Sequence, residues 1–411
     1  MHTQHRPRPH YAWLICLGGV FSFCASMGMV ANLLALCLPD IISDLHLTNA
    51  QGSWLTTTRF LFTLITMLRV NELCDRFGLR QVITFGAGLV GVAYLLLSRA
   101  QSFAACCFAC ALLGIAYCLS GPVPMAVLIG RWFESRRSLA LGLSSAGSGL
   151  VTIIVPPILT RIRTQFGLST AFVCLGVLGF LLCAALWLLI RSTPQELSLS
   201  AYCEPASTKK AAPPNVTPPA MSHAQKCAVL LSSFLMAASA GPGFAHIATF
   251  FRSEGYDEML VATLISCFGF VLLGSKVLCG QVYDRFGGRL GNLYTFGLLL
   301  AGHVLFLLAP AGLVWLAFLS IAVYAMGIPI SSVSAAKWAG DLSSPEDYAS
   351  SVRSFNMAYS LGSLVFSPVP GLLADRFGSF LPTYILFGLL LLISLIILQL
   401  VYGQLGVGKR R

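Results

Sequence analysis

Apolar runs of about twenty residues recur along the whole chain, and no other feature restricts its fold as strongly. A helix of about 20 residues is about 30 Å long, which matches the hydrocarbon core of a bilayer. Backbone polar groups in lipid must be paired inside a helix or a closed barrel. Barrel strands alternate apolar and polar residues, whereas residues 381–400 are apolar without that alternation. The sequence therefore predicts an all-α membrane protein.

The composition leads to the same fold class. Hydrophobic residues make up 56% of the chain and charged residues only 10%, whereas a typical soluble domain is about 25% charged. A water-soluble core could not bury this much apolar surface. We therefore expect most of the chain to lie in the lipid bilayer.

The apolar runs form two sets of six, separated by a segment at 191–225 that is rich in Pro, Ser, Thr and Lys. Such a composition cannot bury a core, so we expect a flexible linker between two pseudo-symmetric six-helix bundles. The bundles would comprise residues 1–190 and 226–411. The expected spans are 12–38, 53–71, 82–99, 104–129, 138–162, 169–190, 226–250, 258–280, 290–309, 313–337, 350–374 and 381–402.

Basic residues predict the orientation of these spans. Twelve spans place both termini on one side, which carries about 17 Lys and Arg residues against about five on the other side. We therefore expect both termini and the linker to be cytoplasmic, in the plasma (inner) membrane. The run from Ala12 to Leu38 is too long for the core of a signal peptide, so we expect it to be retained as span one.

Several function classes lack support in the sequence. The net charge of +11 comes from basic residues that flank spans, so we expect no nucleic-acid partner. Cys106, Cys107 and Cys110 have no nearby His or carboxylate, and free Cys packs as a small hydrophobe, so we expect no metal, no cofactor and no structural disulfide.

The sequence also lacks motifs that are typical of ATP-driven transport and of enzymes. The chain has no Gly-x-x-x-x-Gly-Lys-Ser/Thr phosphate cradle, so a solute or ion gradient is the expected energy source for any transport. We also find no paired carboxylates, no His-Glu-x-x-His and no Gly-x-Ser-x-Gly, so we predict that the chain is not an enzyme and has no catalytic residues.

The tetrapeptide Asp-Arg-Phe-Gly occurs at 75–78 and at 284–287, about half the chain apart and each time between two apolar runs. Duplicated halves around a central site are typical of secondary transporters. A third copy occurs at 375–378, where the predicted topology places it on the outer side. The repeat predicts that one membrane-embedded half has been used twice.

The two cytoplasmic copies resemble the loop signature of the Major Facilitator Superfamily, Gly-x-x-x-Asp-Arg-x-Gly-Arg-Arg. The resemblance implies that this cluster latches the cytoplasmic side shut, although Asn71, Leu79 and Gly288 depart from the pattern. An Asp can accept hydrogen bonds from a helix N-terminus, and a Gly permits a tight turn. The alternative is a basic loop that only sets topology. The predicted gating residues are Asp75, Arg76, Gly78, Arg80, Asp284, Arg285, Gly287 and Arg289.

Three stretches resemble a narrower group, the monocarboxylate porters and oxalate/formate antiporters. They are residues 131–149 at the entry to span five, 375–380 after span eleven and 11–13 at the start of span one. Small residues in the first stretch (Ala140, Ser144) recur at four-residue spacing, which lets helix backbones approach closely. The resemblance implies transport of small organic anions.

Lys276 is the main candidate for a substrate contact. It lies eight residues before Asp284, about 12 Å inside the cytoplasmic end at about 1.5 Å per residue. Burying a charge there costs about 2.5–3.5 kcal/mol, whereas an anion about 4 Å away attracts it by about 4 kcal/mol at a dielectric of 20. In the resembling carriers an Arg at this position binds the substrate carboxylate, and Lys lacks its bidentate fork. The alternative is a Lys that snorkels to the membrane surface.

Other polar residues inside the spans could line a cavity with Lys276. Arg59, expected in the outer third of span two, is either a second anion contact or a residue that reaches the outer interface. The remaining candidates could equally form hydrogen bonds between helices, and these are Asn32, Tyr117, His246, Tyr324, Asn356 and Tyr359.

These observations predict a secondary transporter that moves a small anionic solute, monocarboxylate-like, by alternating access. The alternatives are an exporter of a hydrophobic or drug-like compound and a non-transporting membrane sensor. Coupling to a proton, coupling to a counter-anion and facilitated exchange all stay open, because no carboxylate lies at mid-membrane. His246 or His303 could titrate, and Lys276 could equally lose its proton in an apolar cavity. We expect a monomer in the lipid bilayer.

Overall fold

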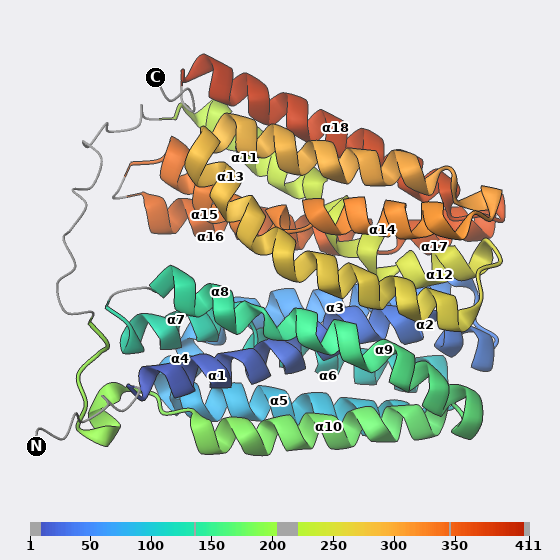
Figure 1. Ribbon diagram of the computed structural model, residues 1–411, viewed down its shortest axis with the longest axis horizontal. Coiled ribbons are helices and arrows are strands. Elements are labelled where there is room, and N and C mark those ends of the chain that lie inside the picture. The colour runs from blue at the N-terminus through green and yellow to red at the C-terminus, as the bar shows by residue number, and fades with distance from the viewer. Residues whose placement is uncertain (1–9, 135–136, 204–220, 345–346, 407–411) are drawn as a thin grey trace, which may run out of the picture.

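The computed structural model describes residues 10–134, 137–203, 221–344 and 347–406, and these residues are almost entirely helical (Figure 1). Helices α1 to α10 form one bundle and α11 to α18 form a second bundle beside it. The start of α1 and the end of α18 lie at the same end of the molecule. We call this end the inner end and the opposite one the outer end, following the orientation expected from the basic residues.

Nine helical segments in the described ranges are long and apolar enough to cross a membrane. The other three expected spans correspond to α3, to the second half of α13 and to the α14–α15 pair. Large hydrophobic side chains cover the outside of the bundles, and Leu188 and Phe270 are 70% and 69% exposed in the isolated chain. Exposed apolar surfaces of this kind are typical of contact with a membrane, and together with the long apolar helices they confirm the expected membrane fold.

The first bundle contains the first six spans. Span one includes a π-helical stretch, η1, whose wider turn separates two α-helical parts. The elements are α1 (Ala12–Phe23), η1 (Cys24–Leu33), α2 (Leu34–Asp44), α3 (Asn49–Met67), α4 (Val70–Phe77), α5 (Leu79–Leu97), α6 (Phe103–Leu119), α7 (Pro122–Trp132), α8 (Arg137–Ser145), α9 (Gly147–Phe166) and α10 (Leu168–Leu189).

The second bundle repeats this plan. Its first span, like span one, contains a π-helical stretch, η3. The elements are α11 (His223–Ala238), η3 (Ser239–Gly243), α12 (Ile247–Ser253), α13 (Glu258–Phe306), η4 (Ala309–Ala311), α14 (Val314–Gly327), α15 (Ile330–Leu342), α16 (Tyr348–Phe366), α17 (Val369–Phe377) and α18 (Leu381–Gln404).

Two spans extend further toward the outer end than expected. Span one continues to Asp44 through Pro39, because its buried Asp40 is paired with arginines instead of ending the helix. Helix α3 begins at Asn49, four residues before the expected start, because Thr48 and Gln51 form a reciprocal capping box. Both extensions bring polar groups to the outer end of the interface between the bundles.

The repeated tetrapeptide ends in a glycine that turns the chain sharply at each copy. Gly78 has φ 83°, Gly287 has φ 80° and Gly378 has φ 70°. These angles are strained for residues with a Cβ atom. Gly287 divides α13 into spans eight and nine. The turn expected at the two inner copies is therefore present, and the third copy has a positive φ at Gly378 as well.

The segment between the bundles is ordered at its beginning. Residues 194–197 form a short 3₁₀ helix, η2 (Pro194–Leu197). Tyr202 then donates a backbone hydrogen bond to Trp132 and packs its ring against Trp13 and Phe133. This part differs from the flexible linker expected for 191–225, because an aromatic side chain anchors it to the first bundle. Residues 204–220 lie outside the described residues.

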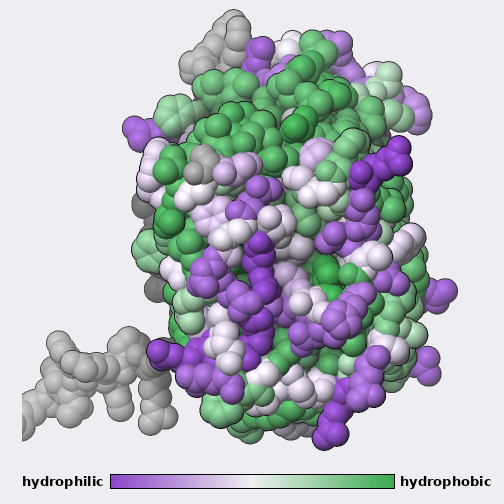
Figure 2. All heavy atoms as spheres, turned by 90° about the vertical axis from the view of Figure 1, so that its right-hand side faces the viewer, coloured by the Kyte–Doolittle hydropathy of each residue, from purple (hydrophilic) through white to green (hydrophobic). Residues whose placement is uncertain are grey.

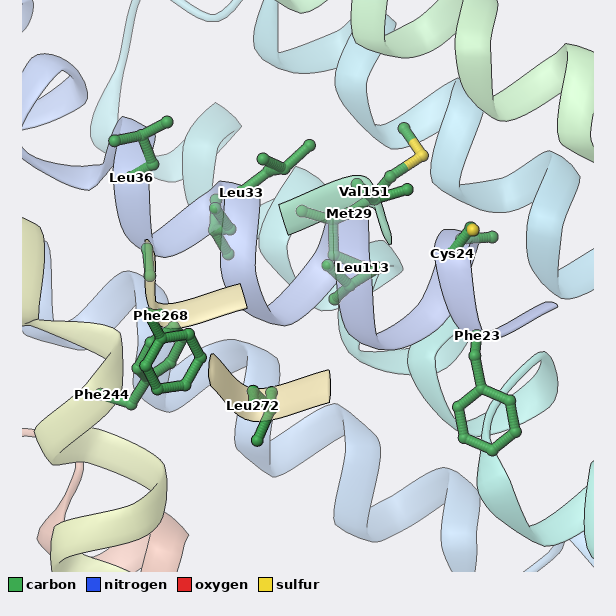
Figure 3. Packing of buried hydrophobic residues seen from close by; sticks show 14 of the residues in the cluster. Phe23, Cys24, Met29, Leu33, Leu36, Leu113, Val151, Phe244, Phe268 and Leu272 are labelled. Atoms are coloured by element: carbon green, nitrogen blue, oxygen red, sulfur yellow. The ribbon is translucent and has the colours of Figure 1, made fainter. Parts of the chain in front are cut away.

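Buried hydrophobic residues of both bundles form one continuous cluster, part of which is drawn in Figure 3. Phe244 and Phe268 of the second bundle stack with their ring centroids 4.4 Å apart. They belong to the same cluster as Met29 and Leu33 of η1. The bundles are thus joined by apolar packing as well as by the polar contacts described next.

Candidate functional site

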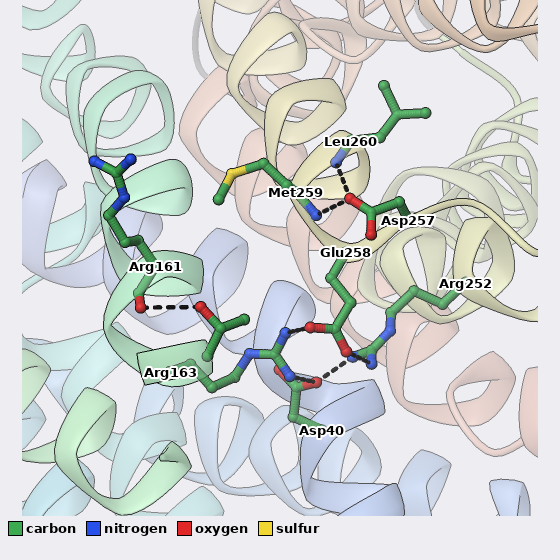
Figure 4. Close-up of polar contacts among 9 residues, drawn as sticks. Asp40, Arg161, Arg163, Arg252, Asp257, Glu258, Met259 and Leu260 are labelled. Carbon is green, nitrogen blue, oxygen red and sulfur yellow. Dashed lines mark hydrogen bonds and ion pairs between the residues drawn. The ribbon is translucent and has the colours of Figure 1, made fainter. Parts of the chain in front are cut away.

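Four charged residues from both bundles close the outer end of the interface (Figure 4). Arg163 on α9 contacts Asp40 on α2 at 2.5 Å and also pairs with Glu258 on α13. Arg252 on α12 pairs with the same two carboxylates. Each arginine therefore joins acids of both bundles, and we call these four residues the outer charge cluster. Because Asp40 is buried, salt screens these pairs less than exposed ones.

Asp375, in the third copy of the tetrapeptide, forms a second closure at this end. One of its carboxylate oxygens accepts hydrogen bonds from the backbone and side-chain nitrogens of Asn49, both at 3.0 Å. The other oxygen accepts from the backbone nitrogen of Ala50 at 2.8 Å. Asp375 on α17 therefore caps the N-terminus of α3 in the opposite bundle, where the helix dipole favours a negative charge.

Hydroxyl groups connect α3 to the second bundle below this cap. The Ser53 hydroxyl accepts a hydrogen bond from the backbone nitrogen of Gly371 at 2.8 Å and contacts His246 Nε2 at 3.2 Å. Thr56 and Ser367 contact each other at 2.9 Å. A Cβ atom at Gly371 would lie 2.0 Å from the carbonyl oxygen of Asn49, so only glycine permits this approach.

The outer face above these contacts is polar at its centre. Figure 2 shows hydrophilic side chains gathered there between hydrophobic regions. A cavity of about 300 Å³ opens on this face. Its lining includes Pro39, Asn49, Arg252, Ser379 and Phe380, so it lies beside the outer charge cluster.

Lys276 lies deeper in the interface and points across it. It is half-buried, and its Nζ donates to the carbonyl oxygen of Ser145 and to the hydroxyl of Ser148, both at 3.2 Å. These serines belong to the first bundle, whereas Lys276 belongs to the second. Among the described residues, no carboxylate forms an ion pair with Lys276. Its charge therefore meets only neutral oxygens, and one of its three N–H groups stays available.

Arg59 is the second cation inside the interface. It lies ten residues after Asn49, about 15 Å from the outer end of α3 and deeper than expected from a span that begins at residue 53. Its side chain is buried, and its guanidinium lies 4.0 Å above the centre of the Phe60 ring. Tyr117 and Tyr359 lie close enough to interact with it electrostatically. The structure thus brings together three predicted site residues, namely Arg59 on α3, Tyr117 on α6 and Tyr359 on α16.

The other predicted site residues form contacts within one bundle or at the outer closure. Asn32 donates to the Thr152 hydroxyl at 2.6 Å, and Tyr324 donates to the carbonyl oxygen of Ser239 at 2.7 Å. These two bonds join helices of the same bundle. Asn356 lies half-buried on α16, three residues before Tyr359.

The predicted gating residues of the inner loops contact their own bundle. Arg80 donates to the carbonyl oxygen of Trp187 at 2.7 Å and stacks on that ring at 4.1 Å. Arg289 donates to Gln399 at 3.3 Å. Arg285 lies 6.0 Å from the ring of its neighbour Phe286.

Asp75 and Arg76 are exposed at the inner end, and the side chain of Asp284 lies outside the described part. None of the gating side chains that the structure describes forms a hydrogen bond or ion pair with the opposite bundle. The bundles are therefore latched at the outer end in this structure, and the described parts of the inner loops form no hydrogen bond or ion pair between them.

Sequence reasoning missed the residues that close the outer end. Asp40 offered a signal, because it is an acid that directly follows an apolar run. The third tetrapeptide offered another, since its Asp375 repeats a motif that is expected at the inner end. Which arginine each acid would meet depends on how two distant parts of the chain pack, and the sequence pattern does not contain that information.

The structure consists of two helical bundles with charged and polar residues at their interface. Comparison with known sequences identifies the protein family. The sequence pattern of the Major Facilitator Superfamily matches residues 17–366. The chain belongs to the Major Facilitator Superfamily. Members of this superfamily are transporters, so the two bundles are the halves of a multi-pass membrane transporter.

Curated relatives within this superfamily are named monocarboxylate transporters. Monocarboxylate transporter 12 of Mus musculus is 22% identical over 96% of this chain and 86% of its own length. The Xenopus laevis protein of the same name is 24% identical, and the match covers 69% of this chain and 65% of the frog protein. Monocarboxylate transporter 13 of Bos taurus is 22% identical over 94% of this chain and 88% of its own.

Solved structures share the fold at low sequence identity. The nucleoside transporter NupG superposes with a TM-score of 0.71 at 12% identity, over 96% of this chain and 99% of its own. A D-xylose-proton symporter superposes with a TM-score of 0.69 at 13% identity, over 94% of this chain and 96% of its own. These likenesses support the fold alone.

Proposed function

We propose that this transporter carries a small organic anion of the monocarboxylate class across the plasma membrane by alternating access, as a monomer with cytoplasmic termini. A gradient of protons or of a counter-anion drives it. The observation that carries the proposal is the position of Lys276, a cation between the bundles whose described partners are serine oxygens alone. The names of the relatives support the same solute class.

The energetics favour an anionic solute at Lys276. Placing a lysine near the membrane centre costs about 2.5–3.5 kcal/mol on insertion scales. A carboxylate about 4 Å away attracts an ammonium group by about 4 kcal/mol at an effective dielectric of 20. A bound anion therefore offsets the cost of burial, which the hydrogen bonds to Ser145 and Ser148 offset only in part. A cationic solute would raise this cost further.

The same contacts suggest how binding is linked to movement. Lys276 joins α13 to the first bundle, because Ser145 ends α8 and Ser148 lies at the start of α9. A carboxylate that takes the ammonium group competes with these two serine oxygens. Anion binding would then release one contact between the bundles, and this release lowers the barrier to their relative motion.

Uptake by purified protein in liposomes tests the proposal. Labelled lactate, pyruvate, formate and oxalate are supplied with and without a pH gradient. We expect wild-type protein to take up at least one of them and Lys276→Ala to abolish this uptake. Lys337→Ala is the matched control, because Lys337 is paired with Asp341 at 3.2 Å on its own helix. Full uptake by the Lys276→Ala variant would remove the site assignment.

A further inference from the structure

Arg59 differs from every other buried arginine that the structure describes. It is 5% exposed, yet its guanidinium forms no hydrogen bond or ion pair with any described residue. Arg163 and Arg252 in the outer charge cluster are also largely buried, and each pairs with two carboxylates. A guanidinium removed from water without an acceptor is costly, because its five N–H groups lose their hydrogen bonds. Among the described residues, this buried arginine therefore has no anionic partner.

The surroundings of Arg59 are aromatic. Its guanidinium lies over the Phe60 ring at 4.0 Å, and Tyr117 from α6 interacts with it electrostatically. Tyr359 from α16 does the same from the opposite bundle. The side chain of Arg59 is therefore buried among residues of both bundles and is not exposed to lipid. Phenol hydroxyls can donate hydrogen bonds to a bound carboxylate.

A close helix contact fixes the position of Arg59. A Cβ atom at Gly114 would lie 2.3 Å from the carbonyl oxygen of Arg59. The backbones of α3 and α6 therefore touch at this level. The Thr63 hydroxyl donates to the carbonyl oxygens of both Arg59 and Gly114, at 2.9 and 3.0 Å. The guanidinium thus extends from a rigid part of the first bundle.

Arg59 and Lys276 lie at different depths. Arg59 is about 15 Å along α3 from the outer end, whereas Lys276 is eighteen residues beyond Glu258, about 27 Å along α13. The two Cα positions therefore differ by about 12 Å in depth. One carboxylate cannot contact both side chains in the same way, so the two cations mark separate positions along the interface.

We propose that Arg59, with Tyr117 and Tyr359, is a second carboxylate-binding position on the outer side of Lys276. This inference rests on the proposed function, because it assumes that the transported solute is an organic anion. The planar fork of Arg59 suits two parallel hydrogen bonds to a carboxylate, whereas Lys276 offers a compact point charge. The solute's carboxylate contacts Arg59 and Lys276 in succession as it crosses.

The test compares Arg59→Gln, Arg59→Lys and the control Arg69→Gln in liposomes, each supplied with the carboxylate that wild-type protein transports. Arg69 lies ten residues further along the chain, and its side chain is 73% exposed and paired with Glu72. Initial uptake rates give KM and the maximal rate. The apparent melting temperature of detergent-purified protein, measured while the same carboxylate is titrated, gives a readout of binding that does not depend on transport.

For Arg59→Gln we expect KM to rise by about tenfold or more, because the hydrogen bonds from the guanidinium to the carboxylate are lost. We expect the melting curve to keep only the part of its response to the carboxylate that Lys276 supplies. We expect Arg59→Lys to restore part of the response, and Arg69→Gln to match wild type. An arginine with a purely structural role would lower the melting temperature but leave the carboxylate response and KM unchanged.

The outcomes separate this inference from the proposed function. If wild-type protein transports a carboxylate and Arg59→Gln has an unchanged KM and melting response, the second position does not exist. The role of Lys276 then still stands. If wild-type protein neither binds nor transports any carboxylate of the panel, both the proposed function and this inference are wrong.

Discussion

The repeated tetrapeptide Asp-Arg-Phe-Gly forms different contacts at the two ends of the molecule. Asp75 at the inner end is exposed, whereas Asp375 at the outer end accepts three hydrogen bonds from the start of α3. The glycine that follows has a positive φ in both copies. The tetrapeptide therefore encodes a helix end with an acid and a turn. What the acid contacts depends on which bundle ends are closed.

Asp375→Asn should weaken the outer closure. An amide carries no charge to interact with the helix N-terminus, and loss of an N-cap costs about 0.5–2 kcal/mol. A change of about 1.4 kcal/mol corresponds to a tenfold shift toward a state with the outer end open. Spin labels at the exposed residues Thr170 and Leu313, on the outer ends of the two bundles, would report longer distances.

Asp347→Asn is the control for this change, because Asp347 is exposed and its carboxylate accepts a described hydrogen bond only from Ser344 of its own loop. Distances in that variant should match wild type. An unchanged distance distribution in Asp375→Asn would show that the cap contributes nothing to closure.

At the scale of elements, close contacts between helices depend on glycines at particular positions. Gly114 on α6 touches the backbone of α3, and Gly371 on α17 touches the start of α3. Helix α3 therefore packs backbone to backbone against both bundles. In membranes, where lipid reduces the hydrophobic driving force, small residues at such contacts let helices gain van der Waals packing.

Gly114→Ala should destabilise the protein. The new Cβ would lie 2.3 Å from the Arg59 carbonyl oxygen, and overpacking of this kind costs about 1–3 kcal/mol. Gly130→Ala is matched, because it gains the same helix propensity of about 1 kcal/mol and its Cβ meets nothing within 4 Å. We expect a lower apparent melting temperature for Gly114→Ala than for Gly130→Ala. Equal temperatures would mean that α3 and α6 can separate without cost.

The helices themselves were predictable, because apolar length and basic flanks depend on local sequence. The ends of the spans were less so. Span one continues through Pro39 and Asp40 because arginines that are distant in sequence stabilise the acid. Helix α3 starts early because Thr48 and Gln51 form a capping box, which is a pattern that the sequence does contain. Among the candidate site residues, depth along a helix pointed to Lys276 and Arg59. It could not show that Asn32 would bond to Thr152 inside its own bundle.

At the scale of the whole molecule, the two bundles meet at the outer end and around Lys276. The outer charge cluster and the Asp375 cap join them at one end, while the described side chains of the inner loops form hydrogen bonds only within their own bundle. This asymmetry fits one of the two states that alternating access requires. The cations Lys276 and Arg59 lie between these ends, where a solute would be exposed to each side in turn.

Equilibrium binding of a labelled carboxylate to purified protein tests the central claim most directly, namely that an unpaired cation inside the membrane binds an anionic solute. We expect saturable binding to wild-type protein and to Lys337→Ala, and a loss of saturable binding in Lys276→Ala up to about a hundred times the wild-type Kd, equivalent to about 2.7 kcal/mol. Binding to Lys276→Ala with an unchanged Kd would contradict the account.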